Sequence, residues 1–438
     1  MTDIDLLITN GIVLTMDPDH RIIDNGAVAV TGDTITAVAP VARMGHPPAR
    51  EIIDAAGGII MPGLINAHTH AAMTLFRGLA DDLPLMTWLN EHIFPAEVCL
   101  DSDRVYAGSL LGCAEMILSG TTCFCDMYLF EDSVARAASA AGMRAVVGEV
   151  LYDFPSPNYG PMEKGLDYTR RLIASWHGDP LITIAVEPHS PYLCAPELLV
   201  RAADIAGENG IPLVIHLSET RNEVDTIRQR YGVTPVTHLA NLGVLAPNLL
   251  ACHCVVLDES DMALLAEHDV KVAHNPESNM KLASGIAPIP QLIDRGVCVG
   301  LGTDGCSSNN NLDLFTEMDT AAKLHKARSL DPTVMNADTV LGMATIDGAR
   351  ALGLDRLIGS IAVGKKADLI VIDTRKPHLT PMYHPVSHMV YAARGADVSA
   401  TIIGGRVLMK DRRLLHLDLE KIMADARQIA EEIQKPSS

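Results

Sequence analysis

The sequence lacks the features that would place the protein in a membrane, outside the cell or on nucleic acid. Its 438 residues contain no apolar run of membrane-spanning length, and the acidic start MTDIDLLITN lacks the apolar core of a signal peptide. Asp and Glu exceed Lys and Arg by 54 to 34, and a formal net charge of -20 argues against a surface for nucleic acid or anionic membranes. We therefore expect a cytoplasmic protein with a small neutral or zwitterionic ligand.

Cysteine is too sparse for a disulfide framework. The chain has nine cysteines, and two pairs, Cys123/Cys125 and Cys252/Cys254, lie one residue apart within apolar runs. No second thiol pair stands at zinc-finger spacing, so we expect buried structural thiols. Internal repeats and low-complexity linkers are also missing. The 48% apolar and 20% charged composition is typical of a globular protein, here with one large domain and a smaller one.

Short apolar runs alternate with longer amphipathic ones between about Gly58 and Gly359. This alternation is typical of a parallel sheet built from βα units. Eight such units predict a TIM barrel, in which functional groups lie at the carboxyl ends of the strands. The predicted strands are GLINAHTH from Gly63, TTCFCDM from Thr121, RAVVGEV from Arg144, ITIAVEPHS from Ile182, PLVIHLSE from Pro212, LLACHCVVL from Leu249, KVAHNPESN from Lys271 and CVGLGTDG from Cys298.

The two ends of the chain have a different pattern, with short alternating strands separated by Gly and Asp turns. Such strands occupy residues 1–57 and recur from Ala367 and Ala400. We expect the two ends to pair into a small β-sandwich, followed by an amphipathic helix over 418–435. The predicted fold class is thus α/β, a (β/α)8 barrel over 58–359 with a sandwich formed by 1–57 and 360–438.

Polar side chains follow the apolar runs where each predicted strand ends. In MPGLINAHTH, strand alternation points His68 and His70 to the same face, where two imidazoles suit a metal such as zinc. Such a pair alone is more often a surface or core feature than a metal site. The same strand-end position is taken, however, by Asp126, His189, His216, His253, His274 and Asp304.

The strand-end set resembles the amidohydrolase superfamily, and the agreement spans nearly the whole chain, including the flanking sandwich. More narrowly, several longer motifs are similar to those of methylthioadenosine/S-adenosylhomocysteine deaminases. These motifs are DDLPLMTWLNEHIFPAE from Asp81, EPHSPY from Glu187, HLSET from His216, HCVVL from His253, HNPESNMKLASG from His274 and GTDGCSSNNNLDLF from Gly302.

The expected metal ligands are His68, His70, His216 and Asp304. Three imidazoles and one carboxylate leave a position open for water, as a catalytic zinc requires. We expect one zinc ion per chain, and Fe²⁺ or Mn²⁺ is compatible with the same donors. A second ion usually needs a bridging acid or modified lysine on strand four. That strand has no Lys, and for Glu187, the candidate bridge, a structural or ligand-orienting role is favoured.

The resemblance implies that Glu219, His253 and Asp304 are catalytic. Glu219 would carry a proton from the water to the purine ring nitrogen, His253 would assist deprotonation of the water, and Asp304 would pass a proton to departing ammonia. Glu219 lies three residues past His216, so strict alternation would turn it away unless the strand ends and the chain bends there. A buried core histidine is the alternative for His253 and for His274.

The resemblance also implies substrate contacts. Glu97 is expected at the ribose hydroxyls, His189 near the base, and Trp88 and Ser308, with Glu219, in the pocket wall. Packing is the alternative for Trp88, and solvation of a turn is the alternative for Ser308. Glu149 departs from the family pattern, which often has Arg near the nucleoside. A carboxylate facing the pocket would disfavour an acidic 5' substituent.

The implied activity is the hydrolytic deamination of an adenosine-type nucleoside to its 6-oxo analogue. Candidate substrates are 5'-methylthioadenosine, S-adenosylhomocysteine, 5'-deoxyadenosine and adenosine. The alternatives are a guanine, pterin or triazine aminohydrolase or chlorohydrolase on the same scaffold and, from a different class, a non-catalytic barrel. All expected ligand and proton-transfer positions are filled, which argues against the last. The sequence leaves the oligomeric state open, and a homo-oligomer is compatible with it.

Overall fold

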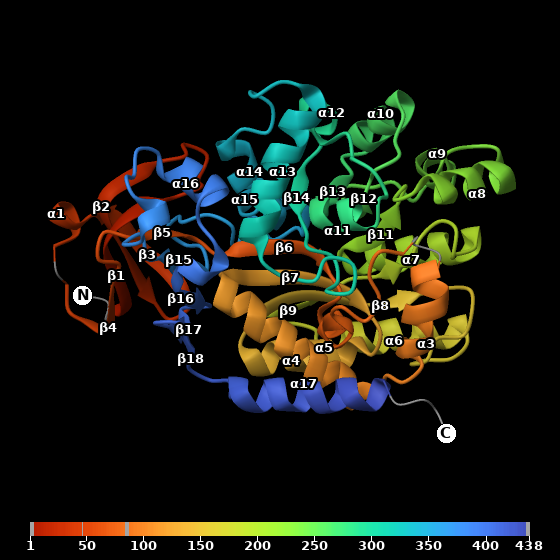
Figure 1. Ribbon diagram of the computed structural model, residues 1–438, viewed down its shortest axis with the longest axis horizontal. Helices are drawn as coiled ribbons and strands as arrows, with labels where there is room; N and C mark the ends of the chain where they lie inside the picture. The colour runs from red at the N-terminus through yellow and green to blue at the C-terminus, as the bar shows by residue number, and fades with distance from the viewer. Residues whose placement is uncertain (1–3, 46, 84–86, 435–438) are drawn as a thin grey trace.

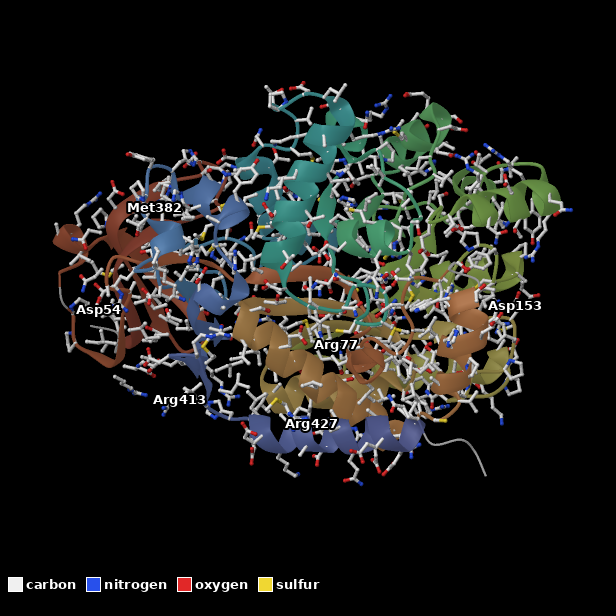
Figure 2. The ribbon with its side chains drawn as sticks, viewed as in Figure 1. Asp54, Arg77, Asp153, Met382, Arg413 and Arg427 are labelled. Carbon is white, nitrogen blue, oxygen red and sulfur yellow. The ribbon has the colours of Figure 1, made fainter. Side chains whose placement is uncertain are left out.

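Two adjoining β structures organise the chain, a parallel barrel and a mixed sheet made from both chain ends (Figure 1). The computed structural model describes residues 4–45, 47–83 and 87–434. In Figure 2, Asp54 and Arg413 lie on the side of the mixed sheet, and Asp153 lies at the far end of the barrel. No helix of the described ranges combines the length and apolarity needed to cross a bilayer.

The barrel strands form at all eight predicted runs, with the fourth divided into two short pieces. Their residues are buried on both faces, which explains why the runs are nearly continuously apolar. Parallel pairing joins β6, β7, β8 and the fourth strand into one sheet. It joins β11, β12, β13 and β14, in that order, into a second sheet. The bounds are β6 Leu64–Thr69, β7 Thr121–Tyr128, β8 Arg144–Leu151, β9 Ile182–Ile184, β10 Glu187–Pro188, β11 Leu213–Leu217, β12 Leu249–His253, β13 Lys271–His274 and β14 Val299–Leu301.

The first joint between these two sheets lies beside the fourth strand. Val186 forms a parallel bridge with Leu213, and the backbone N–H of His216 donates to the His189 carbonyl at 3.0 Å. Backbone pairing therefore continues from strand four to strand five and sets two of the predicted site histidines side by side.

The second joint closes the barrel between its last and first strands. The backbone N–H of Asp304 donates to the His68 carbonyl at 3.0 Å. Gly302 permits this approach, because a Cβ there would lie 2.9 Å from the His68 nitrogen and 2.3 Å from Asn275 Oδ1. Closure and the placement of two predicted metal ligands thus depend on the same contact.

Helices and short helical turns surround the barrel. The longest, α4, begins after the N-cap Asp101 and ends at Gly120 in the left-handed conformation. The elements are η1 Ala71–Phe76, the π-helix η2 Trp88–Ile93, α3 Phe94–Glu97, α4 Ser102–Ser119, α5 Glu131–Ala141, α6 Met162–Ser175, α7 Pro196–Asn209, α8 Arg221–Tyr231, α9 Pro235–Asn241, α10 Glu259–Glu267, α11 Pro276–Lys281, α12 Ile289–Asp294, α13 Leu314–Ser329, α14 Ala337–Met343 and α15 Ile346–Ala351.

The chain ends form one continuous nine-stranded sheet among the described residues. It encloses its own apolar core, to which strands from both ends contribute, so the predicted sandwich takes the form of a single mixed sheet. β5 pairs with β1 and β15. Because β5 spans Ile59–Pro62, the sheet contains residues that the sequence analysis assigned to the barrel. The strands are β1 Ile4–Leu14, β2 Ile22–Thr31, β3 Thr34–Pro40, β4 Ala49–Asp54, β5 Ile59–Pro62, β15 Leu369–Ile372, β16 Val398–Ile403, β17 Arg406–Lys410 and β18 Arg413–Leu414.

The remaining helices lie at the ends of the chain. α17, Leu419–Ile433, packs along α4 of the barrel and not on the terminal sheet (Figure 1). Its predicted last residue, Lys435, lies outside the described residues. The domain division proposed from the sequence stays a prediction. The short elements are α1 Val41–Met44, α16 Pro385–Tyr391, η3 Pro377–Leu379 and η4 Gly395–Asp397.

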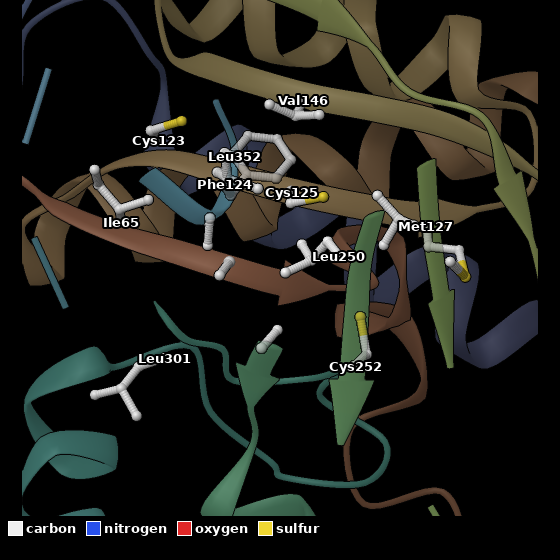
Figure 3. Close-up of a cluster of buried hydrophobic side chains, with 14 of the residues drawn as sticks. Ile65, Cys123, Phe124, Cys125, Met127, Val146, Leu250, Cys252, Leu301 and Leu352 are labelled. Carbon is white, nitrogen blue, oxygen red and sulfur yellow. The ribbon is translucent and has the colours of Figure 1, made fainter. Parts of the chain in front are cut away.

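The paired cysteines are packing residues of the barrel. Figure 3 shows Cys123, Cys125 and Cys252 among buried apolar side chains such as Phe124 and Leu250. All nine cysteines are free. Burial raises the pKa of the Cys123 thiol to about 12, so it stays protonated and behaves as a small apolar group.

A buried ion pair joins the barrel to the terminal sheet. Arg144 of β8 donates from Nε to Asp368 Oδ2 at 2.8 Å and from Nη2 to Oδ1 at 3.2 Å. Both side chains are almost fully buried, and Oδ1 also accepts the Gly404 N–H at 2.8 Å. The bidentate geometry satisfies both charges away from water.

Arg144→Met should destabilise the protein by about 3–5 kcal/mol, because it preserves the stem but leaves the Asp368 carboxylate buried without its cation. Urea unfolding measures the change. Arg201→Met is the matched control, since Arg201 pairs with Glu163 at the surface and its loss should change the free energy of unfolding little. Equal losses in the two variants would contradict the assigned importance of the buried pair.

Candidate metal centre and active site

A pocket opens at the carboxyl ends of the barrel strands. This is the end at which barrels of this architecture carry functional groups. All the predicted site residues except His68 line it, namely His70, Trp88, Glu97, His189, His216, Glu219, His253, Asp304 and Ser308.

His68 lies directly beneath the pocket and completes a compact donor group. Donor atoms of His68, His70 and His216 lie within 4.8 Å of one another, and a second such group joins His68 to His253 and Asp304. Asp304 Oδ1 is 3.0 Å from His70 Nε2 and 3.6 Å from His68 Nε2. The four predicted ligands therefore converge on one point.

The His68 ring fits a metal ligand better than a core residue. The residue is fully buried, and neither ring nitrogen has a hydrogen-bond partner among the described residues. An unpartnered buried imidazole is costly, whereas coordination would use its lone pair. Burial and the adjacent His70 hold the pKa of His68 well below its usual value, which keeps the ring in the neutral form that binds metal. Three imidazoles and one carboxylate suit a single zinc ion.

Backbone carbonyls orient two of the other rings. The Nδ1 atom of His70 is 2.5 Å from the Met127 carbonyl, and Nδ1 of His216 is 2.8 Å from the His189 carbonyl. Because a carbonyl only accepts, each ring carries its proton on Nδ1 and directs an unprotonated Nε2 toward the metal position.

Asp304 is held by hydroxyl groups on the side away from the imidazoles. Its Oδ2 accepts from Ser278 Oγ at 2.6 Å and from Ser308 Oγ at 2.9 Å. Burial alone would raise the pKa of this carboxyl, but its hydrogen bond with His70 and the surrounding imidazoles hold the pKa well below its usual value. The group is therefore an ionised ligand with a fixed orientation.

The bend required to turn Glu219 inward is present. Ser218 adopts a left-handed conformation with φ of 52° directly after β11, and Glu219 then lines the pocket. Glu223 supports this turn, because its carboxylate accepts the N–H groups of Ser218 at 2.8 Å and Glu219 at 2.9 Å. Burial raises the pKa of Glu219, which suits a group that gains and loses a proton.

His253 and His189 occupy neighbouring parts of the pocket. Nδ1 of His253 is 2.9 Å from Asn279 Oδ1, and the residue has a φ of 73° at the end of β12. His189 contacts Ser190 Oγ through Nδ1 at 3.0 Å. Burial and the nearby imidazoles lower the pKa of His189 to about 3, so this ring is neutral and can donate or accept a hydrogen bond.

Glu97 also lines the pocket and accepts a hydrogen bond from the Tyr128 hydroxyl at 2.8 Å. Burial raises the pKa of Glu97 to about 7. Trp88, whose indole N–H has no partner among the described residues, lines the same pocket. Tyr128 was not singled out by the sequence, since a Tyr at a strand end is ordinary packing. Pro84, Leu85 and Met86 of the quoted loop lie outside the described residues.

Glu149 does not line the pocket, so the condition under which its charge would disfavour an acidic 5' substituent is not met. Its carboxylate accepts the Glu131 N–H at 3.0 Å, at the start of α5, and the Asn158 amide at 2.8 Å. Strand alternation gives the pocket position to the next residue, Val150.

Three other strand-end residues stay outside the pocket. His274 contacts His325, with 3.0 Å between their Nε2 atoms, so the core alternative describes it. Asp126 accepts the Ala71 N–H next to His70. Glu187 is fully buried and belongs to neither donor group within the described ranges.

Comparison with known proteins agrees with this geometry. The family model described as the amidohydrolase family matches residues 59–408. The chain is 63% identical, over 98% of both chains, to "5-methylthioadenosine/S-adenosylhomocysteine deaminase" of Syntrophobacter fumaroxidans. It is 48% identical, over 98% of both chains, to "5'-deoxyadenosine deaminase" of Methanosarcina acetivorans. A zinc-bound adenosine deaminase structure from Xanthomonas campestris superposes with a TM-score of 0.97 at 40% identity, covering 99% of each chain. The predicted barrel fold is thereby confirmed.

The purified protein should bind about one divalent ion per chain, because one open set of three imidazoles and a carboxylate is present. His216→Ala should lose this ion, since it removes one of the four donors. Elemental analysis after dialysis measures both. His177→Ala, at a half-exposed position after α6, is the control and should retain the ion. Two tightly held ions, or full retention in His216→Ala, would contradict the assignment.

Proposed function

The chain belongs to the amidohydrolase family, and from this premise we propose how its residues divide the work of the reaction. The protein is a zinc-dependent aminohydrolase that deaminates adenosine-type nucleosides, consuming water and releasing ammonia and the inosine analogue. The convergence of four metal donors with Glu219 and His253 at one open pocket is the observation that carries the proposal.

His68, His70, His216 and Asp304 would hold the zinc ion. When bound, the ion acts as a Lewis acid that lowers the pKa of the attacking water. His253 accepts a hydrogen bond from that water and steadies it below the purine ring. The fixed Nδ1 contacts of His70 and His216 support their role as ligands, because they leave Nε2 free.

Glu219 and Asp304 transfer the protons. Glu219 takes a proton from the water and delivers it to the ring nitrogen beside the attacked carbon, so that the ring can accept the new oxygen. Asp304 accepts the remaining proton of the water, now on the hydroxyl group of the attacked carbon, and passes it to the amino group; the carbon–nitrogen bond then breaks, leaving the 6-oxo group and ammonia. The raised pKa of Glu219 and its position in the pocket support this assignment.

Glu97, His189, Trp88 and Ser308 contact the substrate in this proposal. Glu97 accepts hydrogen bonds from the ribose hydroxyls, since Tyr128 occupies only one of its oxygens. His189, neutral and next to the metal ligands, binds the base. Trp88 forms an apolar wall, whereas Ser308 acts chiefly by donating to Asp304.

We also propose the reducing cytoplasm as the compartment, because nine free cysteines are best preserved there. The partner is the nucleoside itself. Ammonia release measured across adenosine-type nucleosides, guanine, pterins and triazines tests the activity. Turnover of a triazine or guanine in preference to every adenosine-type nucleoside would overturn it.

Glu219→Gln should keep the metal but lower kcat by about 10² to 10⁴, the usual contribution of a positioned proton-transfer group. The amide preserves shape and cannot accept the proton. Ammonia release should therefore fall while metal content stays unchanged, when both are measured on the same preparation. Glu208→Gln, on the exposed end of α7, is the control for an added amide. A metal-free Glu219→Gln protein would instead identify Glu219 as a structural residue, and a normal rate would exclude it from proton transfer.

Small neutral 5' substituents should give the higher kcat/KM. Apolar side chains, among them Met73, Leu89, Phe94 and Leu282, form much of the pocket wall, and neither Lys nor Arg lines it within the described residues. The carboxylate of S-adenosylhomocysteine would therefore be desolvated without a cationic partner. We expect 5'-methylthioadenosine and 5'-deoxyadenosine to exceed S-adenosylhomocysteine by about tenfold or more, a difference of about 1.4 kcal/mol.

Kinetics with the three nucleosides at one pH and salt concentration check this preference. Leu89→Arg supplies the missing cation at the half-buried part of the wall and should narrow the ratio. A clear preference of the unmodified protein for S-adenosylhomocysteine would contradict the argument.

A further inference from the structure

The segment after β13 contacts every residue to which we assign proton transfer. It comprises Asn275, α11 and the turn that ends at Ser284, and it carries the motif HNPESNMKLASG, of which only His274 was considered a candidate. Ser278 donates to Asp304, Asn279 contacts His253, and Ser284 Oγ is 3.5 Å from Glu219 Oε1. These three partners come from three other strand ends, so this segment fixes their positions relative to one another.

The contact between Asn279 and His253 determines where the imidazole carries its proton. Nδ1 of His253 is 2.9 Å from Asn279 Oδ1, and an amide oxygen only accepts hydrogen bonds. Nδ1 must therefore carry the hydrogen. A neutral imidazole has one N–H, so Nε2 has the lone pair. The Nδ2 atom of Asn275 lies farther away, at 3.4 Å, as expected beside a nitrogen that is already protonated.

The environment makes this arrangement rigid. His253, Asn275 and Asn279 are all almost completely buried, so bulk water does not compete for Nδ1. One donor atom of His253 lies within 4.8 Å of donor atoms of His68 and Asp304. With Nδ1 engaged by Asn279, Nε2 is the ring nitrogen available on that side.

We propose that Asn279 is a positioning residue that holds His253 in the Nδ1–H tautomer and so presents an unprotonated Nε2 to the attacking water. In this tautomer Nε2 accepts a hydrogen bond from the water. In the opposite tautomer, Nε2–H has no lone pair with which to accept a hydrogen bond from the water, and it would instead donate to the oxygen lone pair that attacks the ring carbon. Asn279 thus acts through His253 and not on the substrate.

The inference rests on the proposed function for its kinetic part only, because the tautomer is a property of the protein itself. Its direct test is ¹⁵N NMR of the zinc-loaded protein labelled at histidine, in which protonated and unprotonated ring nitrogens resonate far apart. The signals that disappear in His253→Asn identify His253. We expect Nδ1 to be protonated and Nε2 to be unprotonated. A proton on Nε2 in the unmodified protein would overturn the proposal without any substitution at Asn279.

Two substitutions of similar size separate the hydrogen bond from packing. Asn279→Asp keeps an oxygen that accepts from Nδ1–H, whereas Asn279→Leu fills the space without an acceptor. We expect Asn279→Leu to lose the single tautomer and to lower kcat by about 10²-fold, within the range of a positioned proton-transfer group, with KM and metal content unchanged. Asn279→Asp should keep the Nδ1–H tautomer and retain a higher kcat than Asn279→Leu.

Met280→Ala is the control on the same helix, because Met280 is half-exposed and lies outside the pocket lining. It should leave kcat unchanged. If Asn279→Leu retains kcat and metal, or if it raises KM alone, Asn279 does not act through His253. If no nucleoside is deaminated by the unmodified protein, the proposed function fails, and the NMR result still decides the tautomer.

Discussion

Asp304 is the residue on which the barrel closure and the metal centre both depend. Its backbone N–H bonds to the His68 carbonyl and joins the last strand to the first. Its Oδ1 meets His70, while Oδ2 is satisfied by Ser278 and Ser308. A buried carboxylate is tolerated only when its oxygens have partners. Folding and assembly of the site are therefore coupled through the backbone and side chain of one residue.

Left-handed backbone conformations mark the strand ends at which the functional residues lie. Ser218, His253 and Asp304 have φ angles of 52°, 73° and 60°, which non-glycine residues adopt at a cost. At each position the chain leaves the strand direction abruptly and turns a side chain into the pocket. The turn at Ser218 explains why Glu219 faces the metal donors although strand alternation points it away. Support from Glu223 offsets the strain there.

Backbone carbonyls and the segment around α11 hold the metal ligands and the proton-transfer residues in their orientations. The Met127 and His189 carbonyls fix two ligand rings, and α11 with its flanking residues contacts the proton-transfer residues. These supports come from parts of the chain that are far apart in the sequence. A histidine ring can bind metal or accept a proton only through an unprotonated nitrogen. The contacts at Nδ1 therefore determine that Nε2 is the nitrogen with the free lone pair.

The sequence by itself determined the number of barrel strands and, with the family resemblance of its motifs, the set of metal donors that we propose. Apolar runs of strand length reveal buried parallel strands, and a barrel brings their carboxyl ends together, so His68, His70, His216 and Asp304 could be identified without coordinates. The alternation of side chains predicts which face a residue takes within a strand, but it does not predict where a side chain points after the strand has ended.

Only the tertiary structure decided the direction of Glu149, the inward turn of Glu219 and the partners of the catalytic groups. Glu149 pairs with the start of α5 because the neighbouring Val150 takes the pocket face. Ser278 and Asn279 are ordinary polar residues of a short helix until the fold sets them against Asp304 and His253. These contacts join residues that are 18 or 26 positions apart, and their geometry depends on loop conformations that local sequence patterns do not encode.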